Sequence, residues 1–123
     1  MKLIEAINKI DALKQNTFTQ EDKIGWLSTL DGIIKSEIID THEGANKYTF
    51  SGYDESTPLD TELIVPSPYD DIYIKWLEAQ IDYHNGEIGK YSNSMTMYNS
   101  AYSAFDRHYN RNNMPIGKGF KYF

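Results

Sequence analysis

The chain of 123 residues has room for one domain with a single core, and its 40% hydrophobic and 14% aromatic content excludes a wholly disordered protein. It lacks cysteine, which excludes disulfide frameworks, thiol catalysis and zinc–thiolate sites. Its net charge of −6 at pH 7 disfavours general binding to nucleic acid, because contacts with phosphate need a basic surface.

The sequence has no apolar run of transmembrane length, and its first residues do not resemble a signal peptide. We therefore expect a protein that is made in a cytoplasm and does not associate with membranes. We expect it to leave that compartment only as part of a larger particle.

Charge is distributed unevenly along the chain. Residues 1–106 carry eight Lys or Arg against all 18 Asp and Glu, a balance of −10, whereas residues 107–123 carry four bases and no acid, a balance of +4. Residues 54–71 alone hold six acids and no base. A short basic, aromatic tail and an acidic loop in one chain suit docking between neighbouring subunits.

Two amphipathic helices are predicted in the first third of the chain. Residues 1–14 place apolar side chains every three or four positions. A second helix is expected to begin at Thr19, whose hydroxyl suits the N-cap, and to end before Gly44, a typical C-terminal stop. Gly25 and Gly32 lower its intrinsic stability, and the close approach of a neighbouring helix is one reason for them.

Residues 45–66 lack helical periodicity and contain Pro58 and Pro66. Residues 48–50 and 63–65 are apolar enough to form two short strands that pair. We expect either a small β-hairpin or an extended loop in this region.

The longest predicted element runs from Pro68 to Arg111. Ser67 offers an N-cap hydroxyl, Pro68 suits the first helical position, and residues 112–115 contain a proline that ends the helix. Positions at alternating steps of three and four along it are apolar or aromatic with one exception. These positions are Ile74, Leu77, Ile81, His84, Ile88, Tyr91, Met95, Tyr98, Tyr102, Phe105 and Tyr109.

A continuous helix of this length would be too long for its own chain to bury. Its 44 residues would extend roughly 66 Å, against a radius of gyration of about 14 Å for a compact chain of this size. The apolar pattern keeps its phase across Asn85 and Gly86, which favours a continuous or kinked helix over a reversal there. We therefore expect the uncovered positions to form the interface between copies of the protein. The predicted interface residues are Leu77, Ile81, Ile88, Tyr91, Met95, Tyr98, Tyr102, Phe105 and Tyr109.

The predicted fold class is mainly α, a bundle of three to four helices with one long C-terminal helix and a small β-hairpin or extended loop at 45–66. Residues 1–114 form a single helical domain, followed by a basic, aromatic C-terminal tail at 115–123. Three aromatic residues among the last four indicate that this tail docks on a partner. The predicted docking residues are Lys118, Phe120, Lys121, Tyr122 and Phe123.

The three histidines are predicted to have no catalytic or metal-binding role. His42 lies among acids at the end of a predicted helix, where a solvated surface is the common case. His84 and His108 lie on or beside the apolar pattern, where partly buried packing is commoner than catalysis.

The acid pairs Asp54–Glu55 and Asp70–Asp71 are of a type that can hold a divalent cation or serve as acid and base. No nucleophile, histidine or glycine-rich phosphate loop accompanies them. A small hydrolase is therefore the least favoured function, and no catalytic residue, cofactor or metal is predicted.

Four tyrosines share one face of the long predicted helix. A row formed by Tyr91, Tyr98, Tyr102 and Tyr109 suits the stacking of single-stranded nucleic acid bases. No Lys or Arg is interleaved before Arg107, so a half-solvated interface between helices is favoured.

Several stretches of the chain carry a pattern of packing residues, including the run around Trp76 and the Asn85-Gly86 pair. The stretches are residues 59–66, 68–73, 76–82, 85–87, 91–95 and 101–105, and the N-terminal part from residues 4–7 through 40–44 fits the same pattern. Together they resemble a group of small proteins from the structural-gene clusters of tailed phages and Firmicutes prophages. Members of this group are usually regarded as head–tail connector, head completion or adaptor proteins.

The resemblance implies a non-enzymatic, mostly helical virion subunit at the head–tail junction. Such subunits assemble into a homo-oligomeric ring, of about twelve copies, between the portal protein and a tail-side connector or stopper protein. The ring leaves a channel for DNA and needs no sequence-specific contact with it. The resemblance also implies that the C-terminal segment at 115–123 reaches a neighbouring component.

A soluble helical regulator or binding module of a prophage, of the chaperone or anti-repressor type, is the alternative. It predicts a closed bundle with a groove along Trp26 and Trp76, and no incorporation into virus particles.

Overall fold

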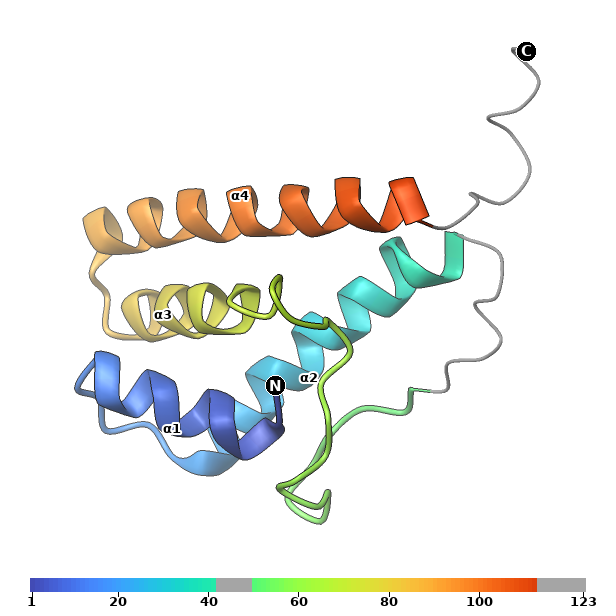
Figure 1. The fold of residues 1–123 in the computed structure, drawn as a ribbon. Helices are drawn as coiled ribbons and strands as arrows, with labels where there is room; N and C mark the ends of the chain where they lie inside the picture. The colour runs from blue at the N-terminus through green and yellow to red at the C-terminus, as the bar shows by residue number, and fades with distance from the viewer. Residues whose placement is uncertain (42–49, 113–123) are drawn as a thin grey trace.

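The computed structural model describes residues 1–41 and 50–112, and over these ranges the fold is mainly α, as predicted. Figure 1 shows the helices stacked in layers, with α4 on the outside of α3. Along the described chain the elements are α1 (Leu3–Leu13), α2 (Gln20–Glu37), a short 3-10 helix η1 (Ile39–Thr41), α3 (Ile72–His84) and α4 (Ile88–Asn112).

The start of α2 follows the predicted capping box. The Thr19 hydroxyl accepts a hydrogen bond from Asp22 N at 3.1 Å, and the Asp22 carboxylate accepts one from Thr19 N at 3.3 Å. The helix ends at Glu37 and continues only as η1, so the predicted extension to Gly44 is too long. Gly44 itself lies outside the described residues.

The predicted continuous helix from Pro68 to Arg111 is wrong, because the chain reverses at Gly86. This glycine has a φ of +75°, a left-handed conformation that disfavours residues with a side chain. Glu87 N donates to Asp82 O at 2.9 Å and Gly86 N donates to Tyr83 O at 3.0 Å, the two bonds of a Schellman motif. α4 then runs back beside α3 (Figure 1).

The reversal allows a single chain to cover most of the apolar pattern. Five of the residues predicted to form an interface between copies are instead in the core of one chain, and a further three are half-buried. The core residues are Leu77, Ile81, Tyr98, Phe105 and Tyr109, and the half-buried ones are Tyr91, Met95 and Tyr102. Ile88 is the one predicted interface residue that is largely exposed, at 65%. The argument that the helix is too long to be buried by its own chain therefore fails.

α3 begins four residues later than the predicted Pro68 start. Tyr69 N donates to Pro66 O at 3.0 Å and Ile72 N donates to Tyr69 O at 3.3 Å. These bonds span three residues, as in successive tight turns, so residues 66–71 form a turn segment before the helix.

The segment 50–66 is an extended loop without a β-strand in its described residues, and its only bridge pairs Lys2 with Glu62. Its backbone closes the start of α1, since Leu3 N donates to Thr61 O at 2.9 Å and Ile4 N donates to Leu59 O at 3.0 Å. These bonds satisfy amides that a helix N-terminus leaves unpaired. The other predicted strand, at 48–50, lies almost wholly outside the described residues.

A buried carboxylate ties this loop to α2 and α3. Asp31, on α2, is fully buried and accepts hydrogen bonds from the hydroxyls of Tyr53 and Tyr73, both at 2.6 Å, and from Ile64 N at 3.2 Å. The Tyr73 hydroxyl also accepts a bond from Val65 N at 2.7 Å. Burial raises the pKa of Asp31, and burial beside Asp31 raises the pKa of both tyrosines.

A second buried carboxylate joins the remaining helices. Asp82 of α3 is fully buried, with Oδ1 2.8 Å from Lys14 Nζ and Oδ2 accepting a 2.6 Å hydrogen bond from the Ser94 hydroxyl of α4. Lys14 follows the end of α1, so one side chain connects three helices.

The two glycines inside α2 do not mark a close helix contact within the chain. A Cβ at Gly25 would meet no atom within 4 Å, and one at Gly32 would meet only the Phe50 ring at 3.8 Å. The predicted reason for these glycines is therefore not borne out in the described chain.

We expect Tyr73→Phe to lower the free energy of unfolding by about 1–3 kcal/mol, because it leaves Asp31 Oδ1 and Val65 N without their buried partner. Tyr83→Phe is the matched control, since Tyr83 is 55% exposed, and we expect a change within about 0.5 kcal/mol. Urea unfolding measures both. Equal stability of the two variants would contradict this role of the Asp31 network.

We expect Gly86→Ala and Gly89→Ala to have opposite effects on stability. Alanine at Gly86 must adopt a left-handed conformation, which costs about 1–2 kcal/mol. Alanine at Gly89 meets no atom within 4 Å and improves the helix by about 0.5–1 kcal/mol. Thermal unfolding of the two variants measures the difference, and a stabilising Gly86→Ala would contradict the turn.

Candidate functional site

The outward face of α4 carries no charge over about four turns. No Asp, Glu, Lys or Arg occurs in the fifteen residues from Tyr91 to Phe105. The exposed positions among them form two adjacent rows, 92, 96, 99, 103 and 93, 97, 100, each with steps of three and four, so they lie on one side of the helix. We call this surface the uncharged face; its residues are Ser92, Asn93, Thr96, Met97, Asn99, Ser100 and Ser103.

The exposed positions of α1 and α2 have a different composition. They include Glu5, Lys9 and Asp11 on α1 and Glu21 and Asp22 on α2. Charged residues on exposed helix faces keep proteins soluble, whereas the centres of protein–protein interfaces are depleted of them. The uncharged face therefore shares with the centres of protein–protein interfaces its lack of charge.

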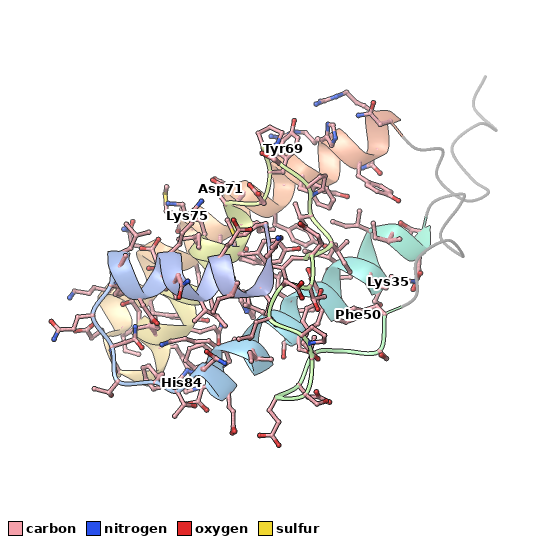
Figure 2. All side chains as sticks on the ribbon, turned by 60° about the horizontal axis from the view of Figure 1, so that its bottom comes forward. Lys35, Phe50, Tyr69, Asp71, Lys75 and His84 are labelled. Atoms are coloured by element: carbon pink, nitrogen blue, oxygen red, sulfur yellow. The ribbon has the colours of Figure 1, made fainter. Side chains whose placement is uncertain are left out.

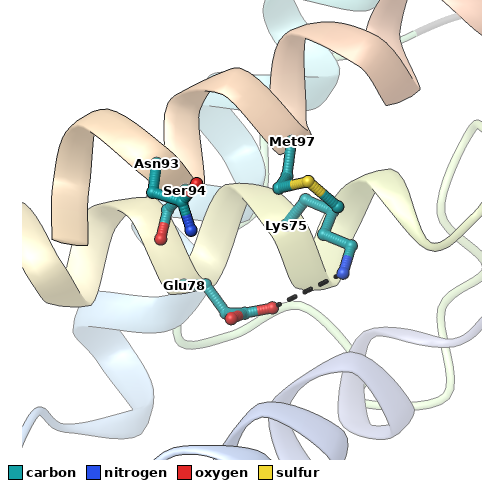
Figure 3. Close-up of a pocket in the computed structure, with 5 residues that line it drawn as sticks. All are labelled: Lys75, Glu78, Asn93, Ser94 and Met97. Carbon is teal, nitrogen blue, oxygen red and sulfur yellow. Dashed lines mark ion pairs between the residues drawn. The ribbon is translucent and has the colours of Figure 1, made fainter.

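A small pocket borders the uncharged face (Figure 3). Lys75 and Glu78 line it from α3, with their charged groups 3.9 Å apart, and Asn93, Ser94 and Met97 line it from α4. Its volume is about 50 Å³, far below that of typical small-molecule sites. Met97 is 48% exposed at its edge, which adds an apolar anchor to the face.

Most tyrosines of the predicted row pack or form hydrogen bonds within their own chain. Tyr98 packs on Trp76 with ring centroids 4.9 Å apart, and burial together with the nearby Glu37 raises its pKa to about 12. The Tyr102 hydroxyl donates to Glu37 Oε1 at 2.6 Å, and Tyr109 is buried. The buried rings of Tyr98 and Tyr109 are not available to stack on nucleic acid bases.

Acidic side chains surround a groove beside the start of α2. Glu21, Asp54 and Glu55 line it together with Ile24 and Tyr53, and its volume is about 310 Å³. A hydrogen bond with Glu55 raises the pKa of Glu21, as expected where two carboxylates lie close together. Within residues 1–41 and 50–112, no group of three or more His, Asp or Glu side chains is arranged to hold a metal ion.

Asp54, one of the acids singled out in the sequence, has local hydrogen-bond partners. The Asp54 carboxylate accepts hydrogen bonds from Ser56 and Thr57, which lower its pKa. Asp71 is the residue before the first turn of α3, and Asp70 lies in the preceding turn.

The histidines that the structure describes pack against aromatic rings. His84 stacks on Trp26 with ring centroids 5.1 Å apart, and its Nδ1 lies 2.8 Å from Gln80 O. His108 stacks on Tyr69 with ring centroids 4.5 Å apart. His42 lies outside the described residues.

The end of α4 carries two exposed bases, Arg107 and Arg111, and begins the basic part of the chain. The predicted docking tail that follows lies outside the described residues. Its residues are Lys118, Phe120, Lys121, Tyr122 and Phe123.

Sequence reasoning missed the Asp31 network, although a signal was present. Asp31 lies four residues after Leu27 and three before Ile34, a position within the apolar stripe of α2. A charge at an apolar position of a helix indicates a buried polar contact. Its tyrosine partners come from distant segments and carry no such local signal.

Comparison with known proteins found no matching family model, no matching curated protein and no similar solved structure. Among the described residues, none of the helices combines the length and the apolar character that crossing a membrane requires.

Proposed function

We propose that this chain is a non-enzymatic virion protein of a tailed phage or prophage, a head–tail connector or adaptor subunit that assembles into a ring between portal and tail. The observation that carries the proposal is the uncharged face of α4, which offers a contact surface on a subunit whose apolar core is already closed. The resemblance of the residues noted above to phage structural proteins directs it to the head–tail junction.

The partners proposed are further copies of the chain, the portal protein and a tail-side connector or stopper protein. The net charge of −6 suits a ring through which DNA passes, because like charge prevents phosphate groups from binding to the channel wall. The basic C-terminal residues 107–123 supply a segment of opposite charge for docking on a neighbour.

The alternative, a soluble prophage regulator or binding module, is favoured by one observation. The α3–α4 hairpin buries most of the apolar pattern in a single chain, as a protein that acts alone would do. The indole Nε1 of Trp76 donates a hydrogen bond of 2.8 Å to the backbone carbonyl oxygen of Trp26.

Mass spectrometry of purified phage particles separates these two functions. The connector proposal expects the chain in the particle at a constant ratio to the portal protein. Its absence from complete particles would contradict the proposal and favour the regulator.

We expect Ser100→Arg to abolish incorporation into particles, because it places a charge at the centre of the uncharged face. Ser36→Arg is the matched control, an exposed serine on α2 that receives the same change. Circular dichroism and urea unfolding are expected to show wild-type folding for both. Incorporation of the two variants at equal levels would contradict the role of the face.

A further inference from the structure

A second exposed surface, which is mainly apolar, lies between α1 and α3. Ala12 and Leu13 of α1 and Ile74 of α3 line a groove of about 470 Å³ that is mainly apolar. Leu13 is 68% exposed, the largest exposed fraction among the large hydrophobic side chains of the described residues. We call this surface the Leu13 groove.

The charges at this groove are mainly positive. Lys9 lies on the α1 side, and Lys75 and Asp71, both labelled in Figure 2, lie on the α3 side. The lining residues balance at +1, with Lys75 also 3.9 Å from Glu78, against a net charge of −6 for the whole chain. An occupant that combines an apolar side chain with acids matches these charges.

The chain itself displays a surface of this kind. Leu59 is 37% exposed, and Pro58 beside it is exposed as well. We call residues 54–62 the Leu59 loop; they hold four acids and no base. Asp60, directly after Leu59, is exposed.

The Leu59 loop cannot fill the groove of its own chain. Leu59 O accepts a hydrogen bond from Ile4 N, which fixes this loop at the first turn of α1. Leu13 lies nine residues further along that helix, a separation of about 14 Å. A Leu59 loop in this groove must therefore belong to another molecule.

We propose that the Leu13 groove binds the Leu59 loop of a second copy of this chain, with Leu59 against Leu13 and Asp60 near Lys9. Each copy has one groove and one loop, and a contact between two different patches can pass from copy to copy and close into a ring. The inference rests on the proposed function in that it names the contact by which copies meet.

The absence of cysteine makes disulfide cross-linking a clean test. One chain carries Ala12→Cys in the groove and a second chain, with a mass tag, carries Pro58→Cys in the loop. Both retain Leu13 and Leu59, and neither can form an intramolecular disulfide. The two chains are mixed at high concentration and oxidised, with Ser36→Cys replacing Pro58→Cys as the control.

We expect the 12–58 disulfide to exceed the 12–36 disulfide by at least about threefold. Lys9→Glu in the groove chain is expected to reduce the 12–58 yield, and Asp60→Lys in the loop chain is expected to restore it. Leu13→Ser is expected to reduce the yield while Ile88→Ser, at a residue of similar exposure, leaves it unchanged. Circular dichroism of each variant confirms the fold.

Equal yields of the 12–58 and 12–36 disulfides would overturn the proposal, as would an unchanged yield with Leu13→Ser. These results are independent of virus particles. If the chain is found in particles but the 12–58 disulfide does not form, the connector function stands and the self-contact fails. If the disulfide forms but the chain is absent from particles, the self-contact stands and the connector function fails.

Discussion

The glycine at position 86 decides which surfaces the molecule buries and which it exposes. Its left-handed conformation ends α3 with two backbone hydrogen bonds and lets α4 return along the same core. Tyr98 and Phe105 are therefore buried in the core of a single chain and not in an interface between copies. Between Tyr91 and Phe105, what α4 leaves outside is a polar face without charge.

Two buried carboxylates hold the layers in one arrangement. Asp31 receives tyrosine hydroxyls from the loop and from α3, and Asp82 joins the region after α1 to α3 and α4. Buried polar groups are costly unless every partner is in place, so such contacts favour one packing over its near alternatives. The Asp31 contacts also fix the path of the loop at 50–66, and with it the position of Leu59 at the start of α1.

The sequence predicted the helical class and the elements with strong local signals. Thr19 caps α2 as expected, because a capping box depends only on four consecutive residues. Ser67 and Pro68 carry a similar signal, but they lie in a turn segment. The backbone hydrogen bonds there, from Tyr69 N to Pro66 O and from Ile72 N to Tyr69 O, form separate tight turns and not a helix. Local chemistry alone does not distinguish these two outcomes.

The reversal at Gly86 was visible as a glycine after a helical pattern, yet the constant phase of the apolar residues argued against it. The constant phase of the apolar positions does not distinguish one helix from two, because two antiparallel helices that pack on one core both turn their apolar sides inward. The partners of Asp31 could not be predicted, because Tyr53 and Tyr73 reach it from 22 and 42 residues away. The lack of charge from Tyr91 to Phe105 could be read from the sequence, but only the fold shows which of those residues are exposed.

The central claim is that the uncharged face of α4 becomes covered when the protein reaches its place of action. Met97 reports on it directly, because its thioether is exposed in the free subunit and is readily oxidised to the sulfoxide. The measurement is the rate of Met97 oxidation in the free protein and in the phage particles to which the proposed function assigns it. The account predicts much slower oxidation in the particle, and equal rates in both states would contradict it.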